Sequence, residues 1–359
     1  MVRLGFIGTG SATSVSDWHA RGFLQDGRAQ IAAVFNRTQA GSIAWARRLS
    51  LDIRVCASVE ELLDRCDAVV ICTPNYTHHS YAMAALAAGK HLLLEKPMTL
   101  SAAQAAELEA AAGQAQKHCT VGYVYRFARP VRSLREIVRE RFGQIFTVHA
   151  GMGGSRLADP RVGMEWRMYA AQSGSGALHD FGSHLIDTAH FITGQRYSKV
   201  FCARETFIRQ RPSDGGPEDV ETDDSACLSL QGAGLGEFLV SRVGLGPMSL
   251  HIAGEGGMAR LELCTKPLLT VWEKSRDGGY SGEEQTIALP QENVEDWARD
   301  QAADFLNGIE GKPVLGAGCS DGRYVDELLE AALRSAASGR AEELSGGGPR
   351  RHEQGVLKN

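Results

Sequence analysis

The sequence lacks the features that mark several large classes of protein. Its 359 residues contain no apolar run approaching the roughly 18 residues that a membrane helix needs. Lysine and arginine number 38 against 43 aspartates and glutamates, and this net charge of −5 gives no basic footprint for nucleic acid. Glycine is plentiful at 41 residues but follows no Gly-X-Y period, which excludes collagen. We therefore expect an ordinary globular protein with neither a nucleic-acid nor a membrane partner.

The eight cysteines form no CxxC pair and no Cys/His spacing typical of zinc, so we predict no metal site. Several of them, such as Cys72, lie in apolar stretches, where cysteine behaves as a small hydrophobic residue. Unpaired cysteines are typical of a reducing compartment. The chain also opens directly into the strand-like run Val2–Ile7, without the pattern of a signal peptide. These features favour a cytoplasmic protein.

Strand and helix signals alternate along the first 125 residues. Short apolar runs are separated by helical patterns such as Ser101–Lys117, whose first residue is a plausible N-cap. The strand-like runs are 2–7, 30–35, 53–55, 68–72, 91–94 and 119–124. Alternation of this kind is typical of a doubly wound parallel sheet with helices on both faces. We predict a Rossmann-like α/β domain over residues 1–125.

From residue 126 the pattern changes to many strands with few helices between them. Several strands between 144 and 273 alternate apolar and polar residues, and glycine-rich turns separate them. An α+β domain with an open, mostly antiparallel sheet is therefore predicted over 126–340, and its polar stretch 205–224 is expected to help shape a pocket. Residues 341–359 have no apolar period, and we expect a mobile tail there.

A glycine-rich loop follows the first strand and precedes a helix. In this setting glycines let the backbone approach a pyrophosphate that rests on the helix N-terminus. The expected dinucleotide contacts are Gly8, Gly10, Ser11, Ala12 and Thr13. Thr13 replaces the third glycine of the dinucleotide fingerprint, and an ordinary glycine turn between a strand and a helix is the alternative.

The end of the second strand bears on the choice of cofactor. An acidic residue is expected there in a protein that binds NAD, because it bonds the ribose 2′-hydroxyl. The sequence instead has Asn36, Arg37 and Thr38, which could pair with a 2′-phosphate. This favours NADP over NAD. The alternatives are that Arg37 is solvated or stacks on the adenine of either cofactor.

Motifs in two further stretches are more specific. One joins Thr73-Pro74-Asn75 and His78 to Glu95-Lys96-Pro97, and the other is Asp180-x-Gly-x-x-His184 behind a glycine-rich turn. With 122–127 and Trp166-Arg167, they resemble the glucose–fructose oxidoreductase / inositol dehydrogenase / rhizopine catabolism (Gfo/Idh/MocA) family over residues 2 to about 340. The resemblance implies NAD(P)-linked oxidation or reduction of a sugar, inositol or related polyol, in a homodimer or homotetramer formed through the open sheet.

The resemblance also assigns residues. It places Lys96, Asp180 and His184 at the catalytic positions: His184 as the acid/base, Lys96 holding the substrate oxygen, and Asp180 bonding a hydroxyl and setting the local charge. Asp180 and His184 lie four residues apart, on one face if 180–192 is helical. Taken alone, each of these three residues could also have an ordinary structural role. The cofactor contacts implied on the first domain are Thr73, Pro74, Asn75, His78, Glu95 and Lys96.

Four weaker candidates for the substrate pocket are Tyr125, Arg126, Trp166 and Arg167. Trp166 could equally be core, and Arg126 could equally contact the cofactor or a structural carboxylate. Two other functions stay open: a glycoside-cleaving relative that retains its nicotinamide, and a non-catalytic dinucleotide sensor. The presence of both Lys96 and His184 counts against the sensor.

Overall fold

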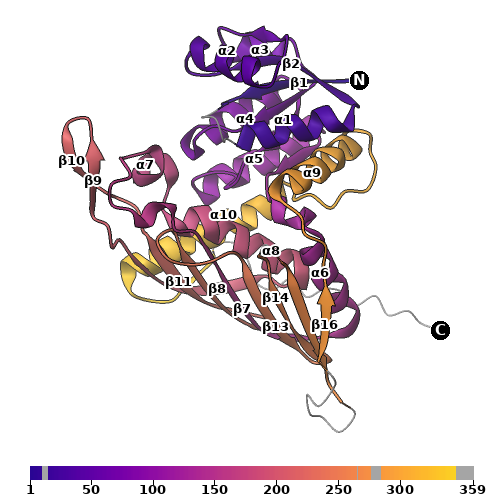
Figure 1. The fold of residues 1–359 in the computed structure, drawn as a ribbon, viewed down its shortest axis with the longest axis vertical. Helices are drawn as coiled ribbons and strands as arrows, with labels where there is room; N and C mark the ends of the chain where they lie inside the picture. Colours follow the sequence, from indigo (N-terminus) through magenta and orange to yellow (C-terminus); the bar gives the residue numbers. More distant parts are fainter. Residues whose placement is uncertain (10–14, 265, 276–283, 345–359) are drawn as a thin grey trace.

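The computed structural model describes residues 1–9, 15–264, 266–275 and 284–344, and these form two large sheets, one above the other in Figure 1, and a two-stranded hairpin. The first sheet is parallel throughout, with strand order β3-β2-β1-β4-β5-β6. Its strands are β1 (Val2–Ile7), β2 (Ala29–Phe35), β3 (Arg54–Val55), β4 (Ala68–Ile71), β5 (His91–Leu94) and β6 (Cys119–Val121). The predicted Rossmann-like sheet is confirmed, and its strand order reverses between β1 and β4, where doubly wound sheets bind ligands.

Helices follow the strands of this sheet as predicted. They are α1 (Val15–Asp26), α2 (Gln39–Arg48), α3 (Val59–Leu63), α4 (His78–Ala87) and α5 (Ala102–Ala115). Every residue of β4 is buried because helices cover the sheet, which explains its uninterrupted apolar run. Ser101 caps α5 as expected, since its side chain accepts a hydrogen bond from Gln104 N.

One helix from late in the chain completes the first core. α9 (Val294–Ile309) packs along α1, and the rings of Phe305 and Phe23 meet edge to face at 5.9 Å. Phe305 is buried in one cluster with residues of β1, β2 and β4. A boundary at residue 125 assigns α9 to the second domain by chain order, whereas its apolar side chains belong to the first.

The second sheet has nine strands in the order β16-β15-β14-β13-β7-β12-β11-β8-β17, and only its β7–β12 pair is parallel among the pairs described. The open, mostly antiparallel sheet is therefore confirmed. Its strands are β7 (Ile145–Gly153), β8 (Tyr197–Glu205), β11 (Ser225–Gly232), β12 (Leu235–Ser241), β13 (Ser249–Gly254), β14 (Gly257–Glu262), β15 (Leu268–Glu273), β16 (Gln285–Ala288) and β17 (Glu342–Glu343).

Helices cover one face of the second sheet, between it and the first domain (Figure 1). They are α6 (Arg129–Arg141), α8 (Ser183–Thr193) and α10 (Cys319–Ser338). β9 (Gln210–Ser213) and β10 (Gly216–Asp219) form a separate hairpin that projects from the side of the domain. Within the ranges described, no helix is both long and apolar enough to cross a membrane.

Two sequence-based expectations about chain segments need correction. The strand expected to reach residue 124 ends at Val121, and a 3-10 turn at Val124–Phe127 leads into α6. The predicted tail 341–359 is not wholly free of structure, because β17 pairs with β8 and Leu344 N donates to Ser198 O. The buried side chain of Leu344 helps to hold this last strand in place, while 345–359 lie outside the described residues.

Candidate active site

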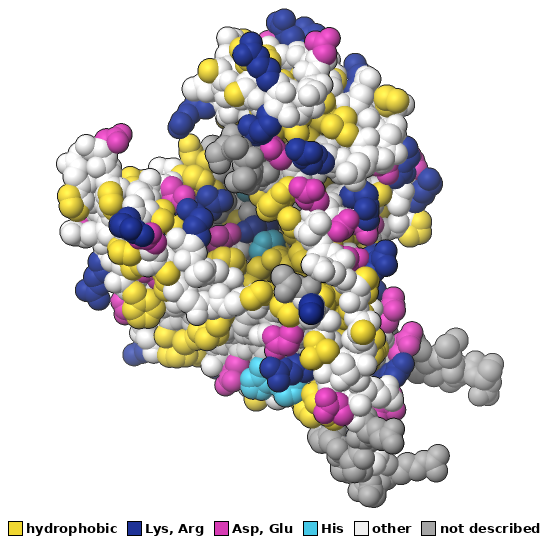
Figure 2. Space-filling view, in the orientation of Figure 1, with side chains coloured by type: hydrophobic (Ala, Val, Ile, Leu, Met, Phe, Trp, Pro, Cys, Tyr) yellow, Lys and Arg dark blue, Asp and Glu magenta, His cyan; other side chains and the backbone are white. Residues whose placement is uncertain are grey.

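A cavity of about 1440 Å³ lies where the two domains meet, and Figure 2 shows the molecule hollowed there. Its walls come mainly from the carboxyl ends of the first sheet's strands and from the segment 154–184 of the second domain, with further residues from α1, Arg242 and Ala298 of α9. Pockets for a single small ligand usually measure about 300–1,000 Å³. The cavity therefore has room for a dinucleotide and a second, smaller molecule.

The first domain's side of the cavity fits a dinucleotide. Gly8 directly follows β1 and has φ +82°, and a Cβ there would stand 2.5 Å from Thr73 Cγ2 and 2.9 Å from Thr73 N. Only glycine tolerates this conformation and this approach of two strand ends at the point where the strand order reverses. The other predicted loop contacts, Gly10, Ser11, Ala12 and Thr13, lie outside the described residues.

The end of β2 places its three predicted residues on the cavity wall. Asn36 Nδ2 donates to Thr9 Oγ1 at 3.1 Å, and Thr38 Oγ1 accepts from Gly41 N at the start of α2. Both side chains are thus used in part by the protein itself. The Arg37 side chain is exposed, with no ion pair or hydrogen bond to its guanidinium within the described chain.

Five of the six cofactor positions implied on the first domain line the cavity: Thr73, Pro74, Asn75, Glu95 and Lys96. Asn75 Nδ2 donates to Ser173 O at 3.0 Å and so ties the two domains together. Glu95 Oε1 lies 2.8 Å from Nε2 of the buried His19 on α1. His78 is the exception. Its Nδ1 and Nε2 meet Pro97 O and Thr73 O at 2.8 and 2.9 Å, so it braces the cavity wall from behind.

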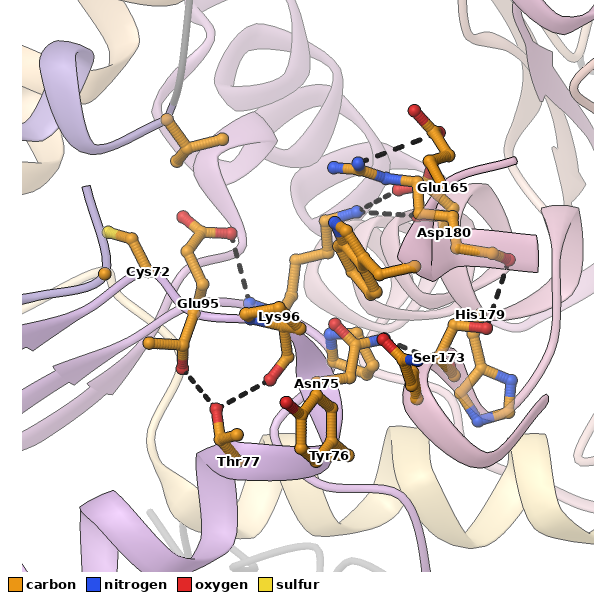
Figure 3. Close-up of a pocket in the computed structure, with 18 of the residues that line it drawn as sticks. Cys72, Asn75, Tyr76, Thr77, Glu95, Lys96, Glu165, Ser173, His179 and Asp180 are labelled. Carbon is orange, nitrogen blue, oxygen red and sulfur yellow. Dashed lines mark hydrogen bonds and ion pairs between the residues drawn. The ribbon is translucent and has the colours of Figure 1, made fainter. Parts of the chain in front are cut away.

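Lys96 crosses from the first domain to the second. The peptide bond that follows it, Lys96–Pro97, is cis. Lys96 Nζ donates to Asp180 Oδ1 at 2.5 Å and to Asp180 O at 2.9 Å, and Figure 3 shows the two side chains meeting at the cavity wall. Burial alone would raise the pKa of the Asp180 carboxyl, but the charges of Lys96 and Arg167 hold that pKa below its usual range. Asp180 is therefore ionised at neutral pH.

Asp180 and His184 are brought together, although not on one continuous α-helix. Asp180 lies in a π-helical turn at Leu178–Gly182, and α8 begins at Ser183. His184 is buried, with its ring edge to face against Tyr125 at 4.9 Å, and its Nδ1 is enclosed without a hydrogen-bond partner. Burial, reinforced by the Lys96 charge, lowers its pKa well below the usual value. Its surroundings therefore favour the neutral imidazole over the protonated form.

The four weaker substrate candidates separate into two kinds. Trp166 and Arg167 line the cavity from a 3-10 turn at Trp166–Met168. Tyr125 lies behind His184 instead. Arg126 does not face the cavity: its guanidinium is buried and donates to both oxygens of Asp187, with Asp321 3.3 Å away. The geometry therefore supports the alternative that Arg126 contacts a structural carboxylate.

Other cavity residues were not anticipated from the sequence. They are Trp18 and His19 from α1, and Arg156, Glu165, Tyr169 and His179 from the second domain. No spacing or motif distinguishes them from surface or core residues. The stretch 205–224, which was expected to help shape the pocket, contributes no residue to the cavity lining. Its Asp223 accepts from Gly176 N and Leu178 N, and so supports the turn before Asp180 from behind.

Comparison with known protein families agrees with this geometry. Residues 2–123 match the model of an oxidoreductase family with an NAD-binding Rossmann fold, and 131–260 match the C-terminal domain of the same GFO/IDH/MocA family. The chain belongs to the Gfo/Idh/MocA family of oxidoreductases. Its first domain is accordingly the Rossmann-fold domain of that family.

Several relatives in this family act on sugars. Levoglucosan dehydrogenase of Pseudarthrobacter phenanthrenivorans is 32% identical over 152 residues, which cover 42% of this chain and 39% of the relative. Glucose-6-phosphate 3-dehydrogenase of Bacillus subtilis is 27% identical over 54% of each chain. These alignments thus span about half the length of the relatives or less. The 1,5-anhydro-D-fructose reductase of Ensifer adhaerens is 25% identical over 97% of this chain and 100% of its own.

Solved structures share the whole architecture. An oxidoreductase domain protein from Kribbella flavida has a TM-score of 0.85 at 25% identity, covering 95% of this chain and 98% of that one. Levoglucosan dehydrogenase in complex with NADH and levoglucosan has a TM-score of 0.87 at 22% identity, over 96% and 99%. At that identity the second likeness establishes the fold alone.

Proposed function

We propose that the protein transfers a hydride between a nicotinamide cofactor and a secondary alcohol or ketone of a sugar, sugar derivative or inositol. The observation that carries this proposal is the meeting of Lys96, Asp180 and His184 at one wall of a cavity that also reaches the dinucleotide side of the first domain. The names of the sugar dehydrogenases and reductases among its relatives support the same substrate class.

In this proposal the bound nicotinamide supplies or accepts the hydride, and the protein manages the proton and the charge. His184 takes the hydroxyl proton through Nε2, because its Nδ1 is enclosed. The Lys96 ammonium holds the substrate oxygen as negative charge develops on it. Asp180 accepts from Lys96 Nζ and so fixes the position of the ammonium group. Reduction of a ketone uses the same groups in reverse.

The preferred cofactor is proposed to be NADP. What supports this is the absence of a carboxylate at the end of β2, together with the exposed Arg37 at the cavity wall. An anionic 2′-phosphate would give this guanidinium the partner that it lacks within the described chain.

The test is a titration of the purified protein with NADPH and NADH, after assay for cofactor retained from expression. Trp18 and Trp166 line the cavity, so quenching of tryptophan fluorescence reports binding. Tighter binding of NADPH, followed by turnover of sugars or ketosugars, is the expected result. Preference for NADH would overturn the cofactor assignment, and binding of neither would overturn the proposed function.

Association of identical subunits through the open sheet is a second part of the proposal. Phe146, Phe201, Leu235 and Leu239 on the second sheet's strands are each more than 40% exposed, with Glu237 exposed between the two leucines of β12. An interface between subunits would cover these apolar side chains. Sedimentation velocity of the wild type and of Leu239→Glu tests it. The expected result is a dimer or tetramer that the substitution weakens, and a monomeric wild type would contradict it.

A further inference from the structure

The second domain's wall of the cavity holds a guanidinium with few partners. Arg167 lines the cavity, and its guanidinium lies over the Trp166 ring, 4.4 Å from the centroid. No acceptor in the described part of the chain receives a hydrogen bond from its side chain. The nearest carboxylate is Glu165, whose Oε1 is 3.9 Å from Arg167 Nη1, too far for a hydrogen bond.

Glu165 is already engaged by another arginine. The same oxygen, Oε1, accepts from Arg156 Nη2 at 2.5 Å, so two guanidinium groups share one carboxylate. Arg242, also on the cavity wall, shows the contrast: its buried guanidinium donates to Asp224 Oδ1 at 2.9 Å and to Thr222 O at 3.0 Å. Arg167 is therefore the arginine of this wall whose guanidinium makes no hydrogen bond within the described chain.

The charged side chains around the reacting position balance in number. Lys96, Arg156 and Arg167 are cationic, whereas Glu95, Glu165 and Asp180 are anionic. Lys96 is paired with Asp180, and Arg156 with Glu165, so Arg167 is the cation of this group that has no hydrogen-bonded carboxylate among the described residues. A carboxylate or phosphate on the ligand would supply that partner, whereas a neutral sugar would not.

We propose that the substrate carries an anionic group, a carboxylate or a phosphate, which Arg167 binds through paired N–H donors while the sugar hydroxyl reacts at Lys96 and His184. A planar guanidinium matches the oxygens of either group, and stacking on Trp166 fixes its plane before the ligand arrives. This inference rests on the proposed function and narrows it to acidic or phosphorylated sugars.

The kinetic test compares D-glucose with D-glucuronate and D-glucose 6-phosphate, and D-galactose with its corresponding acid and phosphate, using the cofactor that binds more tightly. We expect kcat/KM for an anionic member to exceed that of the neutral sugar by at least about tenfold. Arg167→Gln should lower the ratio of kcat/KM for the anionic sugar to kcat/KM for the neutral sugar by about 10–100-fold. This is the effect expected when a hydrogen bond to a charged group is lost. Comparing kcat/KM for the acid with kcat/KM for the phosphate shows which of the two anionic groups the site binds better.

Arg161→Gln is the matched control, because Arg161 is an exposed arginine paired with Asp159 and does not line the cavity. In Arg161→Gln the ratio of kcat/KM for the anionic sugar to kcat/KM for the neutral sugar should stay within about twofold of the wild-type ratio. A wild type that prefers neutral sugars, or an unchanged ratio in Arg167→Gln, would overturn the anion site and leave the proposed function intact. No turnover of any sugar with either cofactor would count against the proposed function itself.

Binding of a simple anion tests the site independently of turnover. Inorganic phosphate is titrated against the protein saturated with cofactor, so that the cofactor's own phosphate sites are filled, and the melting temperature is recorded. Phosphate should raise the melting temperature of the wild type and of Arg161→Gln, and raise it much less in Arg167→Gln. An equal rise in all three proteins, or none in the wild type, would contradict the proposal.

Discussion

Two ion pairs near the start of α8 have similar chemistry and opposite surroundings. Lys96–Asp180 borders the cavity, with side chains 14% and 38% exposed, whereas Arg126–Asp187 is 5% and 1% exposed. The Arg126 guanidinium also donates to Leu315 O and lies 5.0 Å from the Phe191 ring centroid, so each of its three nitrogens has an acceptor within the protein. A closed pair of this kind holds elements together, while a pair open to a cavity is available to a ligand.

The largest effect is expected from breaking the closed pair. Arg126→Met leaves Asp187 as a buried carboxylate without its cation, and it should cost about 3–5 kcal/mol of unfolding free energy. Urea unfolding measures the loss. Arg129→Met is the control, because Arg129 is 61% exposed in its pair with Glu292 and should cost less than about 1 kcal/mol. Equal losses in the two variants would show that enclosure does not matter.

At the cavity, beside the Lys96–Asp180 pair, a substitution should change the catalytic rate. His184→Ala removes the proposed acid/base and should lower kcat by about 10²-fold or more, while cofactor affinity stays nearly unchanged. Steady-state kinetics and cofactor titration measure the two quantities. His190→Ala, on the same helix but outside the cavity lining, should keep kcat within about fivefold. Near-normal turnover of His184→Ala would remove it from the mechanism.

A buried histidine beside the cavity makes stability depend on pH. Burial lowers the pKa of His179 to about 4 from an ordinary 6.5. The unfolded chain therefore binds the proton first, and the native state loses stability as pH falls from about 6.5 toward 4, by about 2 kcal/mol at pH 5. Unfolding in urea at pH 7.5 and 5.0 should show a smaller difference in His179→Asn than in the wild type. The same difference in both proteins would exclude His179 as a source.

The smallest effect is expected at Arg37, whose charge has no partner within the described chain. Arg37→Ala should weaken NADPH binding by about tenfold, or about 1.4 kcal/mol, and NADH binding by less than about twofold. The free energy of unfolding should change by less than about 0.5 kcal/mol, because the side chain is exposed. Fluorescence titration and urea unfolding measure these effects. An equal effect on both cofactors would show that no 2′-phosphate contact exists.

The sequence predicts which residues gather at the site better than it predicts which of their side chains are buried and which face the cavity. Gly8 and the strand–helix alternation reflect local backbone requirements, so the first sheet and its ligand-binding edge could be predicted. Arg126 and Arg167 both stand beside aromatic residues in the sequence, and only tertiary packing turns one to Asp187 and the other to the cavity. Likewise, the helical spacing of Asp180 and His184 does not reveal the π-helical turn between them.

The return of α9 to the first domain has a consequence for modularity. Phe305 and Ala302 fill the apolar face that α1 presents, so a fragment ending at residue 125 would expose that face to water. We expect such a fragment to aggregate, although it contains every strand of its sheet. A chimaera that exchanges the nucleotide domain with that of a relative must therefore exchange two separate pieces of chain, 1–125 and 294–309, for its interior to match.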